Sequence, residues 1–279
     1  MTALLLSLGA SLAWGVSDFG AGTAGRRRSP VGLLLTMRAA GFAAIALLAL
    51  VTAPPWIGDR WPLAVGAGAT TLVGGVALVR ALAIGPMGIA APIIATGAVV
   101  PAVVGLVAGT PPGAVALAGL ALACVGTVLA SRAPGRDGER VSGAGVAAAL
   151  AAAVLLGSGM LLIHEAAAES VVAAVTVQRA TEAGGLLAVF LLLRARGGPP
   201  LAPSAAIVGL GVLECTAITS YATAASLGSL TIAAILSSLY PVVTVLLART
   251  LHGERLSRPQ VAGAALTFAG IALVVLGSA

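Results

Sequence analysis

Hydrophobic residues run along this chain in long continuous stretches, without the alternation of strands or the polar stripe of amphipathic helices. Ten such stretches are separated by short polar segments, and they cover residues 3–24, 31–52, 62–84, 86–108, 112–131, 142–164, 170–193, 204–225, 228–248 and 259–277. A membrane-spanning helix needs about 20 apolar residues, and continuous hydrophobicity disfavours a β-barrel. The pattern predicts an all-α integral membrane protein with ten transmembrane helices.

The composition supports lipid as the main solvent of this chain. Hydrophobic residues make up 59% of it and charged residues 9%, against roughly 25% charged residues in soluble domains. The net charge of +6 does not indicate a nucleic-acid partner, because the arginines lie in short segments beside apolar stretches, where they set topology. Residues 1–24 have no charged segment before them, so we expect a retained first helix and not a cleaved signal peptide.

The chain contains an internal repeat. Residues 118–129 read AGLALACVGTVL and residues 262–273 read AGAALTFAGIAL. Pro101 and Pro241 lie 140 positions apart in the two copies. We therefore divide the chain into a first five-helix repeat at 1–133, a linker at 134–141 and a second five-helix repeat at 142–279.

The arginines predict the orientation of these repeats. Twelve of them lie in or beside the odd-numbered loops, and the even-numbered loops hold only Arg60. The positive-inside rule then places the odd-numbered loops in the cytoplasm and both termini outside a cell (inner or plasma) membrane. Because each repeat has an odd number of spans, the second enters the membrane in the opposite sense. Two inverted five-helix repeats are typical of secondary transporters.

Several short patterns identify a family resemblance. They are Trp14-Gly15, Arg38 after a Ser-Pro helix start, Tyr221-Ala222, Pro241, Gly253-Glu254-Arg255, and the Gly263/Gly270 helix. With these residues the chain resembles the EamA-type transporters of the drug/metabolite transporter superfamily over nearly its whole length. The resemblance implies a ten-helix inner-membrane carrier that moves small metabolites or drugs, often outward. It identifies no substrate, because the superfamily is broad.

The two halves repeat this pattern only in part. Gly157 is the counterpart of Gly15, and Arg179 is the counterpart of Arg38, 141 positions earlier. Trp14 has no aromatic counterpart near Leu156. The first half also carries Gly-Thr-Pro-Pro-Gly at 109–113, where the second has its Gly-Glu-Arg loop. Specificity is expected to lie in the charged residues that differ between the halves, among them Glu214 and the Arg179–Glu182 pair.

Charged residues inside spans are the first candidates for function, because a charge in the bilayer costs several kcal/mol. Asp18 and Arg38 each lie about 10 Å deep at about 1.5 Å per residue, on consecutive helices joined by a short loop. An Asp18–Arg38 ion pair is therefore expected. It acts either as a clamp between helices or as a site where Arg38 binds an anionic substrate group.

The second half contains three further intramembrane charges. Arg179 and Glu182 are three residues apart and share one helical face, where they form a structural pair or a substrate site. Glu214 lies near the middle of its span with no basic residue within a turn. A carboxyl group isolated in apolar surroundings readily holds a proton, so Glu214 is the candidate for proton coupling. The alternative is a neutral carboxyl hydrogen-bonded to a neighbouring helix.

Prolines and aromatic residues supply further candidates. Pro101 and Pro241 lie inside predicted helices, where proline permits a bend that serves as a hinge or only shapes packing. Tyr221 and Tyr240 could hydrogen-bond a substrate, and Trp14 could form a cavity wall or simply pack. The glycines spaced by seven in the fifth and tenth spans predict close helix packing, within one chain or in a homodimer.

The chain shows no enzyme motif and no phosphate-binding loop. Its two histidines, His164 and His252, are 88 positions apart, which disfavours a metal site. No catalytic residue, metal or cofactor is expected. The sequence favours a secondary carrier that exports small metabolites such as amino acids by alternating access, coupled to protons. A cationic multidrug exporter, a lipid flippase or scramblase, and a non-transporting scaffold remain alternatives.

Overall fold

A computed structural model describes residues 2–100, 113–132, 142–198, 201, 203–227, 236, 237, 239–254 and 257–277. The described chain is all-helical. Its α-helices are α1 (Thr2–Gly25), α2 (Pro30–Thr52), α3 (Trp61–Ile84), α4 (Met87–Ala95), α6 (Ala114–Arg132), α7 (Gly143–Ala166), α8 (Val171–Ala195), α9 (Ala205–Leu227), α11 (Tyr240–Leu251) and α12 (Arg258–Gly277). Two short 3-10 helices are η1 (Gly58–Arg60) and η2 (Thr96–Val99).

Six of these helices are long and apolar enough to cross a membrane, which makes the protein a multi-pass membrane protein. They are α1, α2, α3 with the preceding η1, α7, α8 and α9. Their starts follow local sequence signals. Pro30 lies in the first turn of α2, and the hydroxyls of Ser142 and Ser170 accept hydrogen bonds from the first turns of α7 and α8. The ten-span inverted repeat stays a prediction.

The fourth and ninth predicted spans are interrupted. In the fourth, α4 contains Pro92 and passes directly into η2. In the ninth, α11 begins only at Tyr240, so Pro241 lies in the first turn of a helix. The prediction that Pro241 lies inside a helix is therefore wrong, because its missing N–H falls where no intrahelical partner exists. Pro101 lies outside the described residues.

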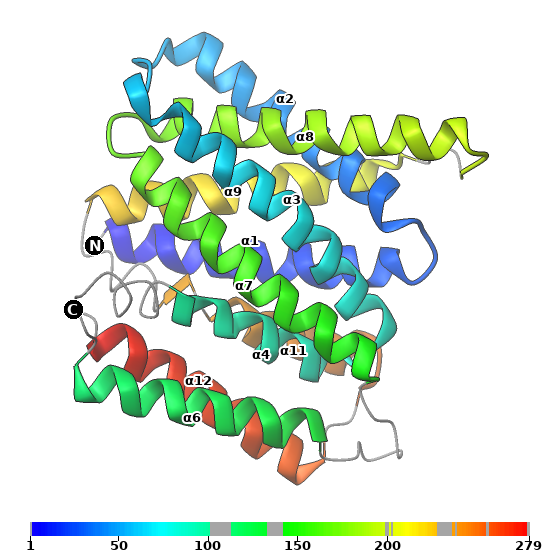
Figure 1. The fold of residues 1–279 in the computed structure, drawn as a ribbon, viewed down its shortest axis with the longest axis vertical. Helices are drawn as coiled ribbons and strands as arrows, with labels where there is room; N and C mark the ends of the chain where they lie inside the picture. The colour runs from blue at the N-terminus through cyan, green and yellow to red at the C-terminus, as the bar shows by residue number, and fades with distance from the viewer. Residues whose placement is uncertain are drawn as a thin grey trace.

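The helices pack mainly across the two halves of the chain. α1 packs on α9, α2 on α8 and α9, α3 on α7 and α8, and α4 on α11 and α7. Figure 1 shows α6 and α12 side by side along one edge of the molecule, below the other helices. Polar residues needed in the interior are thus contributed by both halves.

Glycines allow the close approach of α6 and α12. A Cβ added at Gly126 would lie 2.6 Å from the backbone oxygen of Gly263, and one at Gly270 would lie 2.6 Å from that of Gly119. Such distances are below van der Waals contact, so a side chain at either position would separate the helices. The predicted packing role of these glycines is confirmed for contact within one chain.

Candidate functional site

The candidate site is a cavity of about 100 Å³ in the middle of the helical bundle. Its wall combines residues from both halves of the chain, on α1, α2, α3, α7, α8, α9 and α11. Five residues with a carboxyl or guanidinium group line it: Asp18, Arg38, Arg179, Glu182 and Glu214. Apolar side chains such as Leu34, Leu78 and Met160 complete the wall.

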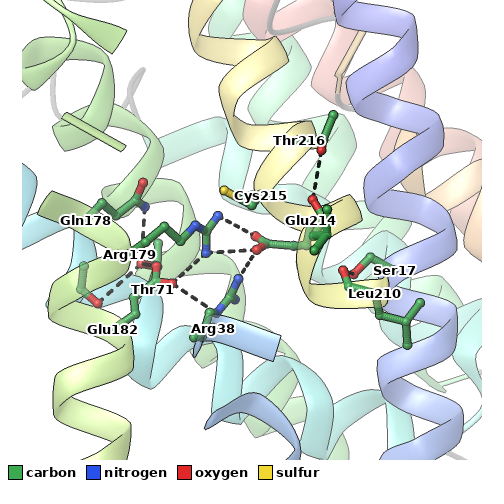
Figure 2. A network of polar contacts seen from close by, with 12 residues as sticks. Ser17, Arg38, Thr71, Gln178, Arg179, Glu182, Leu210, Glu214, Cys215 and Thr216 are labelled. Carbon is green, nitrogen blue, oxygen red and sulfur yellow. Dashed lines mark hydrogen bonds and ion pairs between the residues drawn. The ribbon is translucent and has the colours of Figure 1, made fainter. Parts of the chain in front are cut away.

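Two arginines and two glutamates form a closed ion-pair network at this cavity (Figure 2). Arg38 Nε lies 3.1 Å from Glu182 Oε2, and Arg38 Nη1 contacts Glu214 Oε2. Arg179 Nη1 lies 2.6 Å from Glu182 Oε2 and 2.9 Å from Glu214 Oε2, and its Nη2 donates to Glu214 Oε1 at 2.9 Å. Each guanidinium therefore contacts both carboxylates.

The network is buried, and its four formal charges cancel. Side-chain exposure is 2% for Arg179, 0% for Glu182 and 8% for Arg38, whereas Glu214 reaches 13%. Charges can be kept away from water at this depth because each is paired with an opposite charge and hydrogen-bonded. Glu214 is the member most open to the cavity.

Neutral polar side chains extend the network onto α3. The hydroxyl of Thr71 contacts Glu182 Oε1, and Gln178 Nε2 donates to Thr71 Oγ1 at 3.4 Å. Two buried atoms at this place, Gln178 Oε1 and Arg179 Nε, lack a hydrogen-bond partner among the described residues. The sequence analysis missed Thr71 and Gln178 because neither is charged. A glutamine beside an arginine in an apolar span is the signal that could have identified Gln178.

The expected Asp18–Arg38 ion pair is absent from the described structure. Arg38 is paired with Glu182 and Glu214, and Asp18 has neither an ion pair nor a hydrogen bond within the described part of the chain. The expectation rested on α1 and α2 being neighbours along their length. Instead, α1 packs chiefly on α9 and α11, while α2 packs on α8 and α9.

The interpretation of Glu214 as an isolated carboxyl is also wrong. Cationic groups are absent from its own helix turn, but Arg38 and Arg179 reach it from α2 and α8. The predicted Arg179–Glu182 pair, by contrast, is present at 2.6 Å. The unpaired carboxyl group of the cavity is that of Asp18, from α1.

Aromatic residues stand beside Asp18. Trp14 lies one turn before it on α1 and, with Tyr240 from α11, lines the cavity. The rings of Trp14 and Tyr240 lie 6.2 Å apart edge to face, and the ring of Tyr221 lies 5.7 Å from that of Trp14. Trp14 and Tyr240 are therefore placed to contact a ligand, whereas Tyr221 is not among the residues that line the cavity and contacts Trp14.

Polar contacts also join the halves at one end of the bundle. Glu254, in the loop between α11 and α12, accepts hydrogen bonds at 3.2 and 3.1 Å from the backbone N–H groups of Met87 and Gly88, which begin α4. The same carboxylate accepts from Arg26 Nη2 at 3.2 Å. Glu254 thus satisfies two free N–H groups of a helix start and holds the segment that follows α1.

A looser group of ion pairs joins the segment between α2 and α3 to the segment between α7 and α8. Arg60 Nη1 donates to the backbone oxygen of Glu165 at 2.7 Å. Its side chain also approaches the carboxylates of Glu165 at 3.8 Å and Glu169 at 4.0 Å. These three side chains are about half exposed, so their ion pairs contribute little stability.

The second half of the chain carries a family signature. Residues 143–276 match the model of the EamA-like transporter family. This match covers the second half of the chain and makes that half similar to EamA-like transporters. The match agrees with the resemblance drawn from the sequence and indicates a membrane transporter of the drug/metabolite kind. EamA-like proteins form a transporter family and not an enzyme family.

A further comparison bears on the fold of the chain. A solved crystal structure of a protein superposes on it with a TM-score of 0.68 at 20% sequence identity, covering 99% of this chain and 97% of the other. At this identity the likeness establishes the fold alone. No curated protein matches the chain.

Proposed function

We propose that this EamA-like protein is a secondary-active exporter of small metabolites such as amino acids. The protein lies in a cell membrane and works by alternating access between its two inverted five-helix halves. The odd-numbered loops are in the cytoplasm and both termini are outside. Transport is coupled to protons. The observation that carries this proposal is the central cavity, whose lining combines a balanced four-charge network with the unpaired carboxyl group of Asp18.

The packing of the helices supports two inverted halves. When each helix is exchanged with its counterpart (α1 with α7, α2 with α8, α3 with α9, α4 with α11, α6 with α12), the main contacts between the two halves map onto one another. The α1–α9 contact becomes α7–α3, α2–α9 becomes α8–α3, and α1–α11 becomes α7–α4. A pseudo-two-fold relation of this kind gives alternating access two related states, each with the roles of the halves exchanged.

The polar contacts at the two ends of the bundle fit alternating access. The Glu254 group joins the first loop to the ninth, and the Arg60 group joins the second loop to the sixth. By the arginine distribution these groups lie at opposite membrane faces. In alternating access, the contacts of one group must break while those of the other group stay formed. Because each group contains few ion pairs and these are partly exposed, breaking them costs little free energy.

The charges of the cavity favour a substrate with a cationic group. Two arginines face three carboxyl groups there, so an ionised Asp18 leaves one net negative charge. An ammonium group placed between Asp18, Trp14 and Tyr240 would gain an ion pair and contacts with aromatic faces. An amino acid can satisfy this arrangement if its carboxylate competes with Glu214, the most exposed member of the network, for the arginines.

Asp18 replaces Glu214 as the proposed proton carrier. A coupling carboxyl group must be reachable from the cavity and must exchange its proton against substrate. Asp18 lines the cavity without a basic partner, whereas Glu214 is held by two guanidinium groups. Protonation of Asp18 by one compartment would release an ammonium group, and deprotonation in the other would restore the site.

A cationic drug exporter is the second candidate. The unpaired Asp18 and the aromatic pair Trp14–Tyr240 favour it, since this combination binds cations that carry no carboxylate. The flippase and scaffold alternatives have no observation of comparable weight.

The proposal is tested in proteoliposomes with radiolabelled amino acids and, separately, ethidium. Counterflow of an amino acid, competed by unlabelled amino acids and not by ethidium, supports the metabolite carrier. Ethidium flux without amino-acid counterflow transfers the proposal to the cationic drug exporter. Flux of neither class, with protein-dependent movement of fluorescent lipid between leaflets, would overturn both.

A further inference from the structure

A second groove, separate from the central cavity, lies between α1, α9 and α11 and has a volume of about 890 Å³. Its walls are mostly apolar. They comprise Val16, Phe19, Gly20, Thr23, Ala24, Ala206, Ile207, Leu210, Leu247 and Leu251, with His252 and Ser204 at the edge. Several of these residues are exposed, Leu251 to 67%. The groove is therefore open to the surroundings of the bundle and not sealed by the described helices.

One end of the groove is cationic. Arg26, Arg27 and Arg28 line it directly after the end of α1, and its described lining contains no carboxyl group. Arg26 is engaged by Glu254. Arg27 is exposed, and its side chain has no ion pair or hydrogen bond within the described part of the chain.

The length of the groove matches one leaflet of a bilayer. Val16 and Arg27 are eleven positions apart, along α1 and the turn that follows it, and a helical rise of about 1.5 Å per residue gives about 16 Å. Half of a hydrocarbon core of about 30 Å is about 15 Å. When the arginines lie at headgroup level, the apolar walls reach the middle of the membrane.

The wall of the groove is fixed by contacts of its own. The His252 ring packs on Phe19 at a centroid distance of 4.8 Å, and His252 Nε2 lies 3.2 Å from Thr23 Oγ1. On the opposite side, Gly20 allows Leu210 to approach α1 so closely that an added Cβ would meet its side chain at 2.6 Å. The groove is thus a built surface and not a gap between loosely packed helices.

We propose that this groove binds one anionic phospholipid. Its phosphate is held by Arg27, and an acyl chain lies along α1 between Phe19, Leu210 and Leu247. An anionic headgroup is preferred to a zwitterionic one, because none of the described residues that line the groove carries a carboxyl group to receive a headgroup ammonium, and the nearby Glu254 is engaged by Arg26. The lipid lies next to Arg26, which holds Glu254, so its headgroup borders the polar contacts that close this end of the bundle.

The test is native mass spectrometry of the full chain released from bilayers of equal phosphatidylglycerol and phosphatidylcholine. The wild type is expected to retain one phosphatidylglycerol per chain in preference to phosphatidylcholine. Arg27→Gln is expected to lower that preference about fivefold, the scale of one arginine at an anionic surface. Arg196→Gln, an exposed arginine outside the groove, is the matched control and should retain the preference.

The apolar part of the groove is tested separately. Ala206→Trp places a large ring in the groove and should reduce retention of both lipids, whereas Ala144→Trp, exposed on α7 outside the groove, should not. Equal retention of the two lipids by the wild type would overturn the proposal, as would an unchanged preference in Arg27→Gln. The lipid proposal would also fail if the wild type formed a dimer and Ala206→Trp dissociated it, because a second copy of the chain would then occupy the groove.

Discussion

Arg38 from the first half of the chain and Glu214 from the second form an ion pair in the middle of the bundle, although 176 residues separate them in the sequence. Arg179, the repeat counterpart of Arg38, contacts the same carboxylate at 2.9 Å. Each half thus supplies one arginine, while both glutamates come from the second half. In this network the two arginines are therefore related by the repeat, whereas the two glutamates have no counterpart in the network from the first half.

Glu182→Gln is expected to be the most destabilising conservative change in this network. Glu182 is fully buried and contacts Arg38, Arg179 and Thr71. Its loss leaves two guanidinium groups with a single carboxylate, and removing one partner of a buried ion pair costs about 3–5 kcal/mol. Thermal unfolding in detergent should show a clearly lower midpoint.

Glu169→Gln is the matched control for this change. Glu169 is half exposed and lies 4.0 Å from Arg60, and an exposed pair of this kind contributes at most about 1 kcal/mol. Equal midpoints for Glu182→Gln and Glu169→Gln would show that the buried network does not hold the halves together.

Gly126→Val is expected to separate α6 from α12. The new Cβ would lie 2.6 Å from the Gly263 oxygen, and overpacking of this kind costs about 1–3 kcal/mol. Gly9→Ala is the control, because no atom lies within 4 Å of a Cβ added at Gly9. The free energy of unfolding is measured for both variants. A stability loss of the same size in both variants would contradict the assigned packing.

The two end contacts predict opposite changes in access to the cavity. With both native cysteines replaced by alanine, Ala21→Cys places a thiol in the cavity wall. Adding Glu254→Ala removes the bonds to Arg26 and to the start of α4, so alkylation by an impermeant maleimide should quicken from the face that carries the 253–254 loop. Adding Arg60→Ala should quicken it from the other face.

Alkylation rates measured from each side of oriented vesicles test this pair of variants. The unmodified Ala21→Cys protein supplies the reference rate on each side. If both variants quickened labelling from the same face, the two groups could not act as opposite gates.

Much of the helical framework followed from the sequence. Helix positions were readable because each span is a continuous apolar run between short polar loops, and Pro30 lies in the first turn of α2, as the Ser-Pro helix start indicated. The close packing of Gly126 and Gly270 also followed, because small residues spaced by seven share a face. Pro241 was misplaced because a helix break before it leaves no mark in the hydropathy.

The partners of the charged residues could not be obtained in this way. Sequence neighbours suggested Asp18 for Arg38, but the order in which helices pack is set by tertiary contacts across 140 or more positions. The isolation of Glu214 was judged along its own helix, where no cation lies, whereas both its partners arrive from other helices. Arg179–Glu182 was recovered because a pair three residues apart is fixed by the helix itself.

The role assigned to Asp18 is tested most directly by flux in proteoliposomes under an imposed pH gradient. The variant is Asp18→Asn, the matched control is Asp59→Asn, which is exposed in η1, and the substrate is the amino acid that shows counterflow. Asp18→Asn should lose flux driven by the pH gradient while the wild type and Asp59→Asn retain it. Undiminished gradient-driven flux in Asp18→Asn, or wild-type flux that ignores the gradient, would contradict proton-coupled transport through this cavity.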